Sequence, residues 1–183
     1  MRIYTVGHST RPQSEFIALL VAHGIRRLGD VRTMPRSRHN PQFNSDALAA
    51  ALGEAGIGYV HLPALGGLRH TTPASVNLGW RNKSFRGYAD YMQTAPFAQA
   101  IDELIVLGSS APTAIMCAEA VPWRCHRSLI ADALVVRGIE ALEIVSKERT
   151  TPHALTSFAR ADGTAITYPP EQLPLEAGWA PKR

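Results

Sequence analysis

The sequence predicts an α/β protein whose mostly parallel, doubly wound sheet contains about five strands. Short apolar segments of strand length alternate with longer segments of helical spacing over most of the 183-residue chain. Glycine or proline stands near the end of many of these segments, where helices and strands commonly stop. Such alternation is typical of strand–helix–strand units with parallel strands. We expect one domain over residues 1–183, because a chain of this length can bury a sizeable core.

Three strands and two helices are expected in the first third of the chain. The strands cover residues 2–6, about 27–31 and 58–62. The first helix is capped by Ser14 and ends at Gly24, and the second is capped by Asn44-Ser45 and ends before Gly56. Their apolar positions recur at helical spacing: Phe16, Leu19 and Leu20 in the first helix, and Leu48 and Leu52 in the second.

Residues 64–87 interrupt this alternation. The segment contains Gly66-Gly67, Pro73 and four basic residues, so we interpret it as a long functional loop rather than a linker. Helical spacing returns at residues 87–93 and again from Pro96 to Gly108.

The remaining elements follow the same alternation. We expect a buried strand at 113–117, a helix at 125–137 and a last strand at 141–145. The tail at 150–183 is rich in proline and is expected to add a short helix or an edge strand. This tail is also a candidate contact for a homodimer.

The composition excludes several classes of protein. The chain is 45% hydrophobic and 19% charged, which is ordinary for a globular domain. No apolar run approaches the roughly 20 residues that cross a bilayer, so no membrane partner is expected. The N-terminal residues have the pattern of a strand and lack that of a signal peptide. Two cysteines are too few for a disulfide scaffold, so we expect reduced thiols and a cytoplasmic location.

The positive charge is concentrated in the first half of the chain. Residues 1–92 carry 11 basic and 5 acidic side chains, whereas residues 93–183 carry 8 basic and 10 acidic ones. Sixteen of the 19 basic residues are arginine, which binds phosphate and carboxylate in a bidentate manner. Aromatic residues are interleaved with the basic ones, namely Trp80, Phe85, Tyr88 and Trp123. This pattern favours nucleic acid or a phosphorylated small molecule as the partner, with a solvated basic face as the alternative.

Polar and reactive side chains follow three of the expected strands. His8 and Ser9 follow the first strand, Asp30 and Arg32 the second, and Cys117 and Glu119 the fourth; Cys125, His126 and Arg127 begin the next helix. The carboxyl ends of parallel strands meet at one edge of a sheet, and ligands of doubly wound folds bind there. The sequence therefore predicts that these residues form one site.

The acids and the thiol of this site have two interpretations each. Glu119 and Asp30 either move protons and orient water or serve as counter-ions of neighbouring arginines. Cys125 lies at a predicted helix N-terminus among cations, which favours a thiolate nucleophile assisted by His126 or Glu119. Adjacent helical positions point about 100° apart, which argues against a contact between Cys125 and His126. The alternative for Cys125 is simple packing, and packing is favoured for Cys117.

The turn after the first strand and the arginines complete the predicted site. His8 is expected to act as an acid and Ser9 to bind an anion, or else both form a simple turn. Phosphate is expected to contact Arg32, Arg36, Arg86, Arg124 and Arg127. A metal could be held by His8, Cys117, Cys125 and His126, but closely spaced ligand pairs are absent, so we expect no metal and no cofactor.

Six short blocks of the chain carry a resemblance to a known family. They are Thr5-Val6-Gly7-His8-Ser9, Asp30-Val31-Arg32 with Pro35 and Ser37, Leu65-Gly66-Gly67, Phe85-Arg86-Gly87-Tyr88, Met116-Cys117-Ala118-Glu119 and Cys125-His126-Arg127. In this order they resemble DUF488, a family of uncharacterised bacterial proteins. The resemblance implies a Rossmann-like α/β fold, a three-layer sandwich, and it implies no particular activity.

Three functions remain open at this point. The first is a protein that binds or processes nucleic acid or nucleotides in an arginine-lined pocket, by hydrolysis at a glycosidic or phosphate bond. The second is a non-enzymatic module that binds a nucleotide or a partner through the same arginines. The third is a redox protein that depends on its thiols or on a metal.

Overall fold

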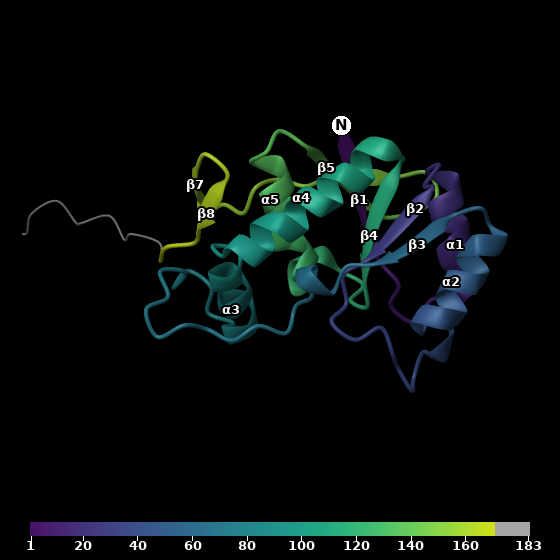
Figure 1. The fold of residues 1–183 in the computed structure, drawn as a ribbon, viewed down its shortest axis with the longest axis horizontal. Coiled ribbons are helices and arrows are strands. Elements are labelled where there is room, and N and C mark those ends of the chain that lie inside the picture. The colour runs from purple at the N-terminus through teal and green to yellow at the C-terminus, as the bar shows by residue number, and fades with distance from the viewer. Residues whose placement is uncertain (171–183) are drawn as a thin grey trace, which may run out of the picture.

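The central element is a six-stranded, mostly parallel sheet, seen in a computed structural model that describes residues 1–170 (Figure 1). The strand order is β3-β2-β4-β1-β5-β6, and β6 alone is antiparallel to its neighbour. The strands are β1 (Arg2–Gly7), β2 (Arg27–Asp30), β3 (Gly58–His61), β4 (Thr113–Cys117), β5 (Glu140–Ile144) and β6 (Thr150–Pro152). A separate two-stranded hairpin is formed by β7 (Arg160–Asp162) and β8 (Ala165–Thr167).

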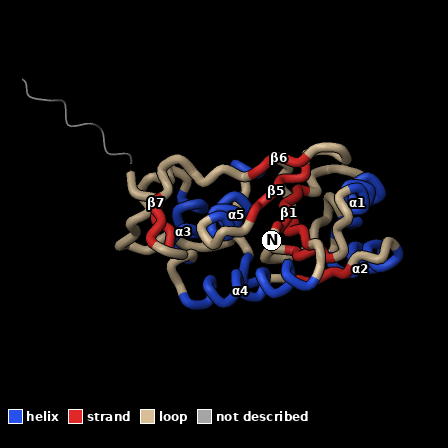
Figure 2. The backbone as a smooth tube through the Cα atoms, turned by 90° about the horizontal axis from the view of Figure 1, so that it is seen from above, coloured by secondary structure: helices blue, strands red, loops and turns tan. Residues whose placement is uncertain are grey.

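Among residues 1–170, α-helices pack on both faces of this sheet. On one face, α1 (Gln13–Ala22) and α2 (Ser45–Glu54) contribute the buried side chains of one apolar cluster. On the other face, a second cluster draws on α3 (Lys83–Tyr91), α4 (Ala95–Ser110) and α5 (Arg127–Val135). Figure 2 shows α1 and α2 on one side of the strands and α4 and α5 on the other.

The chain turns back across the sheet after the edge strand β3, and its connections change face at the same point. The connections that follow β1 and β2 run over the face covered by α1 and α2, whereas those that follow β3 and β4 run over the opposite face. The loop after β4 therefore leads to one face of the sheet, whereas the loops after its two neighbours, β1 and β2, lead to the other face. Ligands of open α/β sheets bind in the crevice that such a divergence leaves at the carboxyl ends of the strands.

The expected strands and helices are present, with corrected boundaries. Ser14 was expected to cap the first helix, but α1 begins one residue earlier, after Pro12, and has no side-chain cap. Gly24 (φ +66°) and Gly56 (φ +70°) have the left-handed backbone that favours glycine after a helix. The helix expected from residue 125 begins at Arg127, because Cys125 is still extended.

The loop expected at 64–87 is shorter than predicted. Its last five residues belong to α3, which begins at Lys83 because the Asn82 side chain accepts a hydrogen bond from the Ser84 amide, 2.8 Å away. The tail supplies β6 as an edge strand, one of the two structures expected there. Residues 171–183 of the Pro-rich tail, which was also considered as a dimer contact, lie outside the described residues.

Among residues 1–170, no helix has the length and apolar composition needed to cross a membrane.

Candidate functional site

A pocket of about 520 Å³ opens at the carboxyl ends of β2 and β4. The loop after β2 contributes Arg32, Thr33, Met34 and Arg36, and the glycine-rich loop contributes Gly67 and Leu68. Ser84 and Phe85 come from the first turn of α3, and the β4–α5 connection provides Cys117, Ala118, Glu119, Arg124, Cys125 and His126. The pocket therefore lies at the crevice that the strand order predicts.

The floor of the pocket is a cluster of two thiols and one imidazole. Cys117 is the last residue of β4, and Cys125 and His126 precede α5. Both sulfur atoms and a ring nitrogen of His126 all lie within 4.8 Å of one another, and Cys125 Sγ is 3.7 Å from His126 Nδ1. The argument against a Cys125–His126 contact was wrong, because it assumed helical geometry for an extended residue.

The imidazole of His126 is held in one orientation. Its Nε2 donates a hydrogen bond to the carbonyl oxygen of Val31, 3.0 Å away, so Nδ1 faces Cys125. Nδ1 donates to a Cys125 thiolate when the ring is protonated and offers a lone pair when the ring is neutral. The ring also lies beside Tyr88, with centroids 5.1 Å apart. A Cβ atom on Gly67 would lie 2.5 Å from Nδ1, so only glycine leaves room for the ring at that place.

The two thiols lie close together, and each shifts the pKa of the other. A hydrogen bond from the Cys117 thiol lowers the pKa of Cys125 well below its ordinary value against the opposing effect of burial, and His126 and the Arg127 guanidinium lower it further. The same hydrogen bond, together with burial, raises the pKa of Cys117. The two shifts favour Cys125 over Cys117 as the thiol that ionises first.

Arg127 lies beneath the floor rather than in the pocket. Its side chain is fully buried, and its two terminal nitrogens donate to the Glu143 carboxylate at 3.2 Å and to the Glu119 carbonyl oxygen at 2.8 Å. The Thr5 hydroxyl also donates to Glu143. Within the described part of the chain, Nε of Arg127 is buried without a hydrogen-bond partner. A ligand in the pocket cannot use a guanidinium that is occupied and enclosed in this way.

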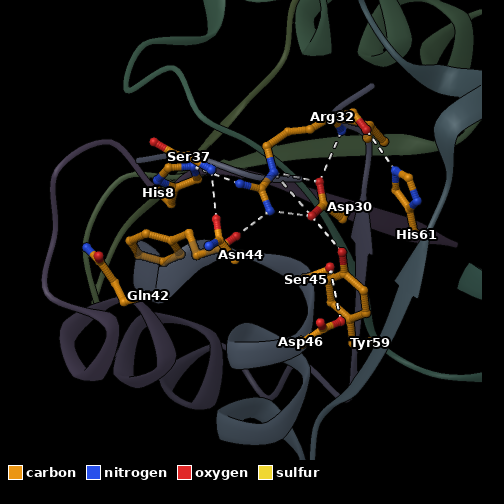
Figure 3. A network of polar contacts seen from close by, with 12 residues as sticks. His8, Asp30, Arg32, Ser37, Gln42, Asn44, Ser45, Asp46, Tyr59 and His61 are labelled. Atoms are coloured by element: carbon orange, nitrogen blue, oxygen red, sulfur yellow. Dashed lines mark hydrogen bonds and ion pairs between the residues drawn. The ribbon is translucent and has the colours of Figure 1, made fainter. Parts of the chain in front are cut away.

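Asp30 and Arg32 form a buried ion pair next to the pocket (Figure 3). The Asp30 carboxylate is fully buried and accepts from Nε of Arg32 at 2.9 Å, from its terminal nitrogen at 2.5 Å and from the Tyr59 hydroxyl at 2.8 Å. Arg32 also donates to the Phe43 carbonyl oxygen, 2.7 Å away. This geometry makes Asp30 a counter-ion that orients Arg32, the second of the two roles that the sequence left open.

His8 belongs to the same network. Its Nε2 lies 3.4 Å from a terminal nitrogen of Arg32, its Nδ1 donates to the Ser9 carbonyl oxygen, and its ring stacks on Phe43. Burial lowers its pKa to about 4, so His8 is neutral near pH 7. Ser9 has a positive φ of 51°, and its amide donates to the Ala118 carbonyl oxygen, which joins this turn to the end of β4.

The fold thus gathers some of the predicted site residues around one pocket and separates others. Those that line it are Arg32, Arg36, Glu119, Arg124, Cys125 and His126. Those outside its lining are His8, Ser9, Asp30, Arg86 and Arg127. Arg86 instead donates two hydrogen bonds to the Trp80 carbonyl oxygen.

Sequence reasoning did not select three residues that shape the site: Glu143, Tyr59 and Gly67. Glu143 offered a signal, since a single internal acid in a strand with buried apolar neighbours has to be paired. Gly67 was noted only as part of a loop, although a Gly-Gly pair is typical of close backbone approach. Tyr59 gave no signal, because one tyrosine in a strand is ordinary.

The pocket combines three kinds of chemistry. Soft sulfur and nitrogen donors form its floor, the exposed Glu119 offers a carboxylate in its wall, and the exposed guanidinium groups of Arg36 and Arg124 stand at its edge. Such a set can bind an anion, and it can activate a nucleophile or hold a soft metal ion.

A family model described as "Domain of unknown function DUF488" matches residues 12–134. No curated protein and no solved structure matches the chain.

Proposed function

The chain belongs to the DUF488 family, a domain of unknown function, so a function has to be inferred from the site. We propose that the pocket binds a nucleotide or the end of a nucleic acid and hydrolyses it. One observation carries the proposal: exposed arginines and apolar side chains line the same pocket whose floor holds two free cysteines and an imidazole.

The arginines of the pocket edge supply the contacts to phosphate. Arg36 and Arg124 are exposed, and neither forms an ion pair with another described residue. A guanidinium group that is free to turn can give two parallel hydrogen bonds to a phosphate group. Arg32 adds positive charge, although its guanidinium is held by Asp30.

Apolar side chains beside these arginines favour a nucleotide over inorganic phosphate. Met34 and Leu68 line the pocket and are 73% and 75% exposed. Phe85 lines it as well and packs on Trp80 with centroids 4.8 Å apart. Exposed apolar groups next to a cationic edge suit a ligand that joins an anionic group to a flat ring.

Glu119 is the proposed general base. Glu119 is exposed and lines the same pocket as the cluster on the floor. A carboxylate in this position can take the proton of a water whose oxygen attacks, while the phosphate or glycosidic bond of the ligand breaks and its leaving group departs.

The proposal also includes the type of α/β fold and the location of the protein in the cell. The sheet with helices on both faces, and the pocket at the divergence of its loops, support a Rossmann-like three-layer sandwich. Two thiols that must stay reduced support a cytoplasmic location.

Equilibrium binding of mononucleotides and of a short single-stranded oligonucleotide tests the proposal. We expect R36Q and R124Q each to weaken binding about tenfold or more, since a charged hydrogen bond contributes about 1.5–3 kcal/mol. Arg38 is exposed and does not line the pocket, so R38Q serves as the matched control. Unchanged affinity in both pocket variants, or an affinity that does not fall with added salt, would contradict phosphate binding.

Glu119→Gln distinguishes an enzyme from a binding module. We expect this variant to keep its affinity for nucleotide and to lose hydrolysis, measured by chromatography of the products. Equal turnover in wild type and variant would exclude Glu119 as the base. A wild-type protein that binds nucleotides but turns over none of them would be a binding module.

A further inference from the structure

We propose that Cys117, Cys125 and His126 form a zinc site at the floor of the pocket, with a fourth coordination position open toward the bound ligand. This inference deepens the proposed function and rests on it for the role of the metal. The presence of the metal rests on the three side chains alone.

The distances between the three donors suit a tetrahedral zinc ion. Bonds of about 2.3 Å to sulfur and about 2.0–2.1 Å to nitrogen place neighbouring ligand atoms about 3.5–3.8 Å apart. Cys125 Sγ and His126 Nδ1 are 3.7 Å apart, and all three donor atoms lie within 4.8 Å of one another. A contraction of about 1.3 Å or less at the remaining pairs would therefore complete the site.

The hydrogen bond of His126 Nε2 is of the kind that metal-bound histidines form with their second ring nitrogen. Such histidines donate their other N–H group to a carboxylate, a carbonyl or water, which fixes both the tautomer and the orientation of the ring. In this protein Nε2 of His126 donates to the Val31 carbonyl oxygen at 3.0 Å, and Gly67 and Tyr88 enclose the ring. The lone pair of Nδ1 is thereby directed at the sulfur atoms.

The charged groups at and below the floor of the pocket are compatible with a bound Zn²⁺ ion. Two thiolates neutralise Zn²⁺, and the buried Arg127 is already neutralised by Glu143. Two adjacent thiols that point into one space, with an imidazole as the third member, form a donor set that zinc prefers over harder cations. The ligands come from two segments that the fold brings together, which explains why ligand spacing in the sequence argued against a metal.

One side of the donor cluster faces the pocket. Cys117, Cys125 and His126 all line it, and Glu119 lines the same cavity. Three protein ligands with one open position are typical of catalytic zinc, whereas structural zinc has four protein ligands. Zinc in this place would lower the pKa of a bound water to about 7, and Glu119 would accept its proton.

Metal binding is tested on the full chain after reduction and removal of metal by a chelator. We expect one equivalent of Zn²⁺ to bind in competition with a chromophoric chelator. X-ray absorption at the zinc edge is expected to give two sulfur ligands at about 2.3 Å and one nitrogen ligand at about 2.0–2.1 Å. Co²⁺ in the same site is expected to show thiolate-to-metal charge-transfer bands. None of these measurements needs a variant, so a misfolded mutant cannot obscure them.

Variants then assign the ligands. C117S, C125S and H126Q are each expected to weaken zinc binding by more than the roughly 10–100-fold loss that changes in outer-shell partners cause. His39 is exposed and lies outside the pocket lining, so H39Q is the matched control and should bind as wild type. Failure of the reduced wild type to bind zinc in a 1:1 ratio, or zinc bound without sulfur, would overturn the proposal.

Zinc binding and nucleotide binding can be tested independently of each other. R36Q and R124Q should bind zinc as wild type, because both arginines are exposed and neither belongs to the donor set. Nucleotide binding without zinc uptake would overturn the zinc site alone. Zinc uptake without nucleotide binding would overturn the proposed function alone.

Discussion

Replacing Asp30 by asparagine would show whether this carboxylate holds the protein together as a buried counter-ion. Asp30 is fully buried and Arg32 is 7% exposed, and the carboxylate accepts hydrogen bonds from both Arg32 and Tyr59. Asparagine keeps the shape of the side chain but removes its charge. The change therefore leaves the Arg32 guanidinium buried without a compensating negative charge.

The magnitude follows from the cost of an unpaired buried charge. Removing one partner of a buried ion pair typically destabilises a protein by about 3–5 kcal/mol. For a chain of this length, each kcal/mol corresponds to about 2–4 °C in the melting temperature. We therefore expect D30N to lower the free energy of unfolding by about 3–5 kcal/mol and the melting temperature by about 6–20 °C.

Urea unfolding, followed by circular dichroism, measures this loss. Asp46 is exposed, so the control D46N should change the free energy of unfolding by no more than about 0.5 kcal/mol. The double variant D30N/R32Q should be less destabilised than the sum of the two single variants, because it contains neither charge. A loss below about 1 kcal/mol in D30N, or strictly additive effects in the double variant, would refute the counter-ion role.

Two further perturbations probe the walls of the site. Gly67→Ala would place a Cβ atom 2.5 Å from the His126 ring, so we expect a loss of about 1–3 kcal/mol in unfolding free energy and displacement of the imidazole, visible in its NMR signals. Gly53→Ala, whose Cβ atom would have no neighbour within 4 Å, should leave that ring unchanged. The buried His8 has a pKa lowered to about 4 by desolvation, so the unfolded chain binds the extra proton as the pH falls from about 6.5 to about 4. Stability should fall by about 2–3 kcal/mol more over this range in wild type than in H8Q, and parallel unfolding curves would disprove this role of His8.

The order of strands and helices was predictable because it depends on local patterns. The apolar run at Thr113–Cys117 and the helical spacing in α4 need no knowledge of distant residues. The start of α3 was missed because its cap, Asn82, lies in a segment whose glycines and prolines indicate a loop. The neighbours of each strand were not predictable either, because pairing such as that of β1 with β4 depends on contacts between distant segments.

The chemistry of the site was predictable in kind but not in detail. Glu119, Cys125 and His126 were chosen because they follow a buried strand or precede a helix, and they line the pocket. Asp30 was chosen by the same rule and proved to be enclosed, because Tyr59 from the adjacent strand and Arg32 occupy its oxygens. Position at a strand end does not distinguish an open carboxylate from one that is already paired.

The sequence by itself determined the alternation of strands and helices and the placement of reactive side chains at the strand ends, since both follow from the spacing of residues along the chain. Only the tertiary structure decided which charges are neutralised. Arg127 is matched by Glu143 and Arg32 by Asp30, while Arg36 and Arg124 remain exposed. The physical reason is that a buried charge needs a partner, and for Arg127 that partner lies on another strand of the sheet. Asp30 and Arg32 are two residues apart, so their pairing depends on the fold only through their burial.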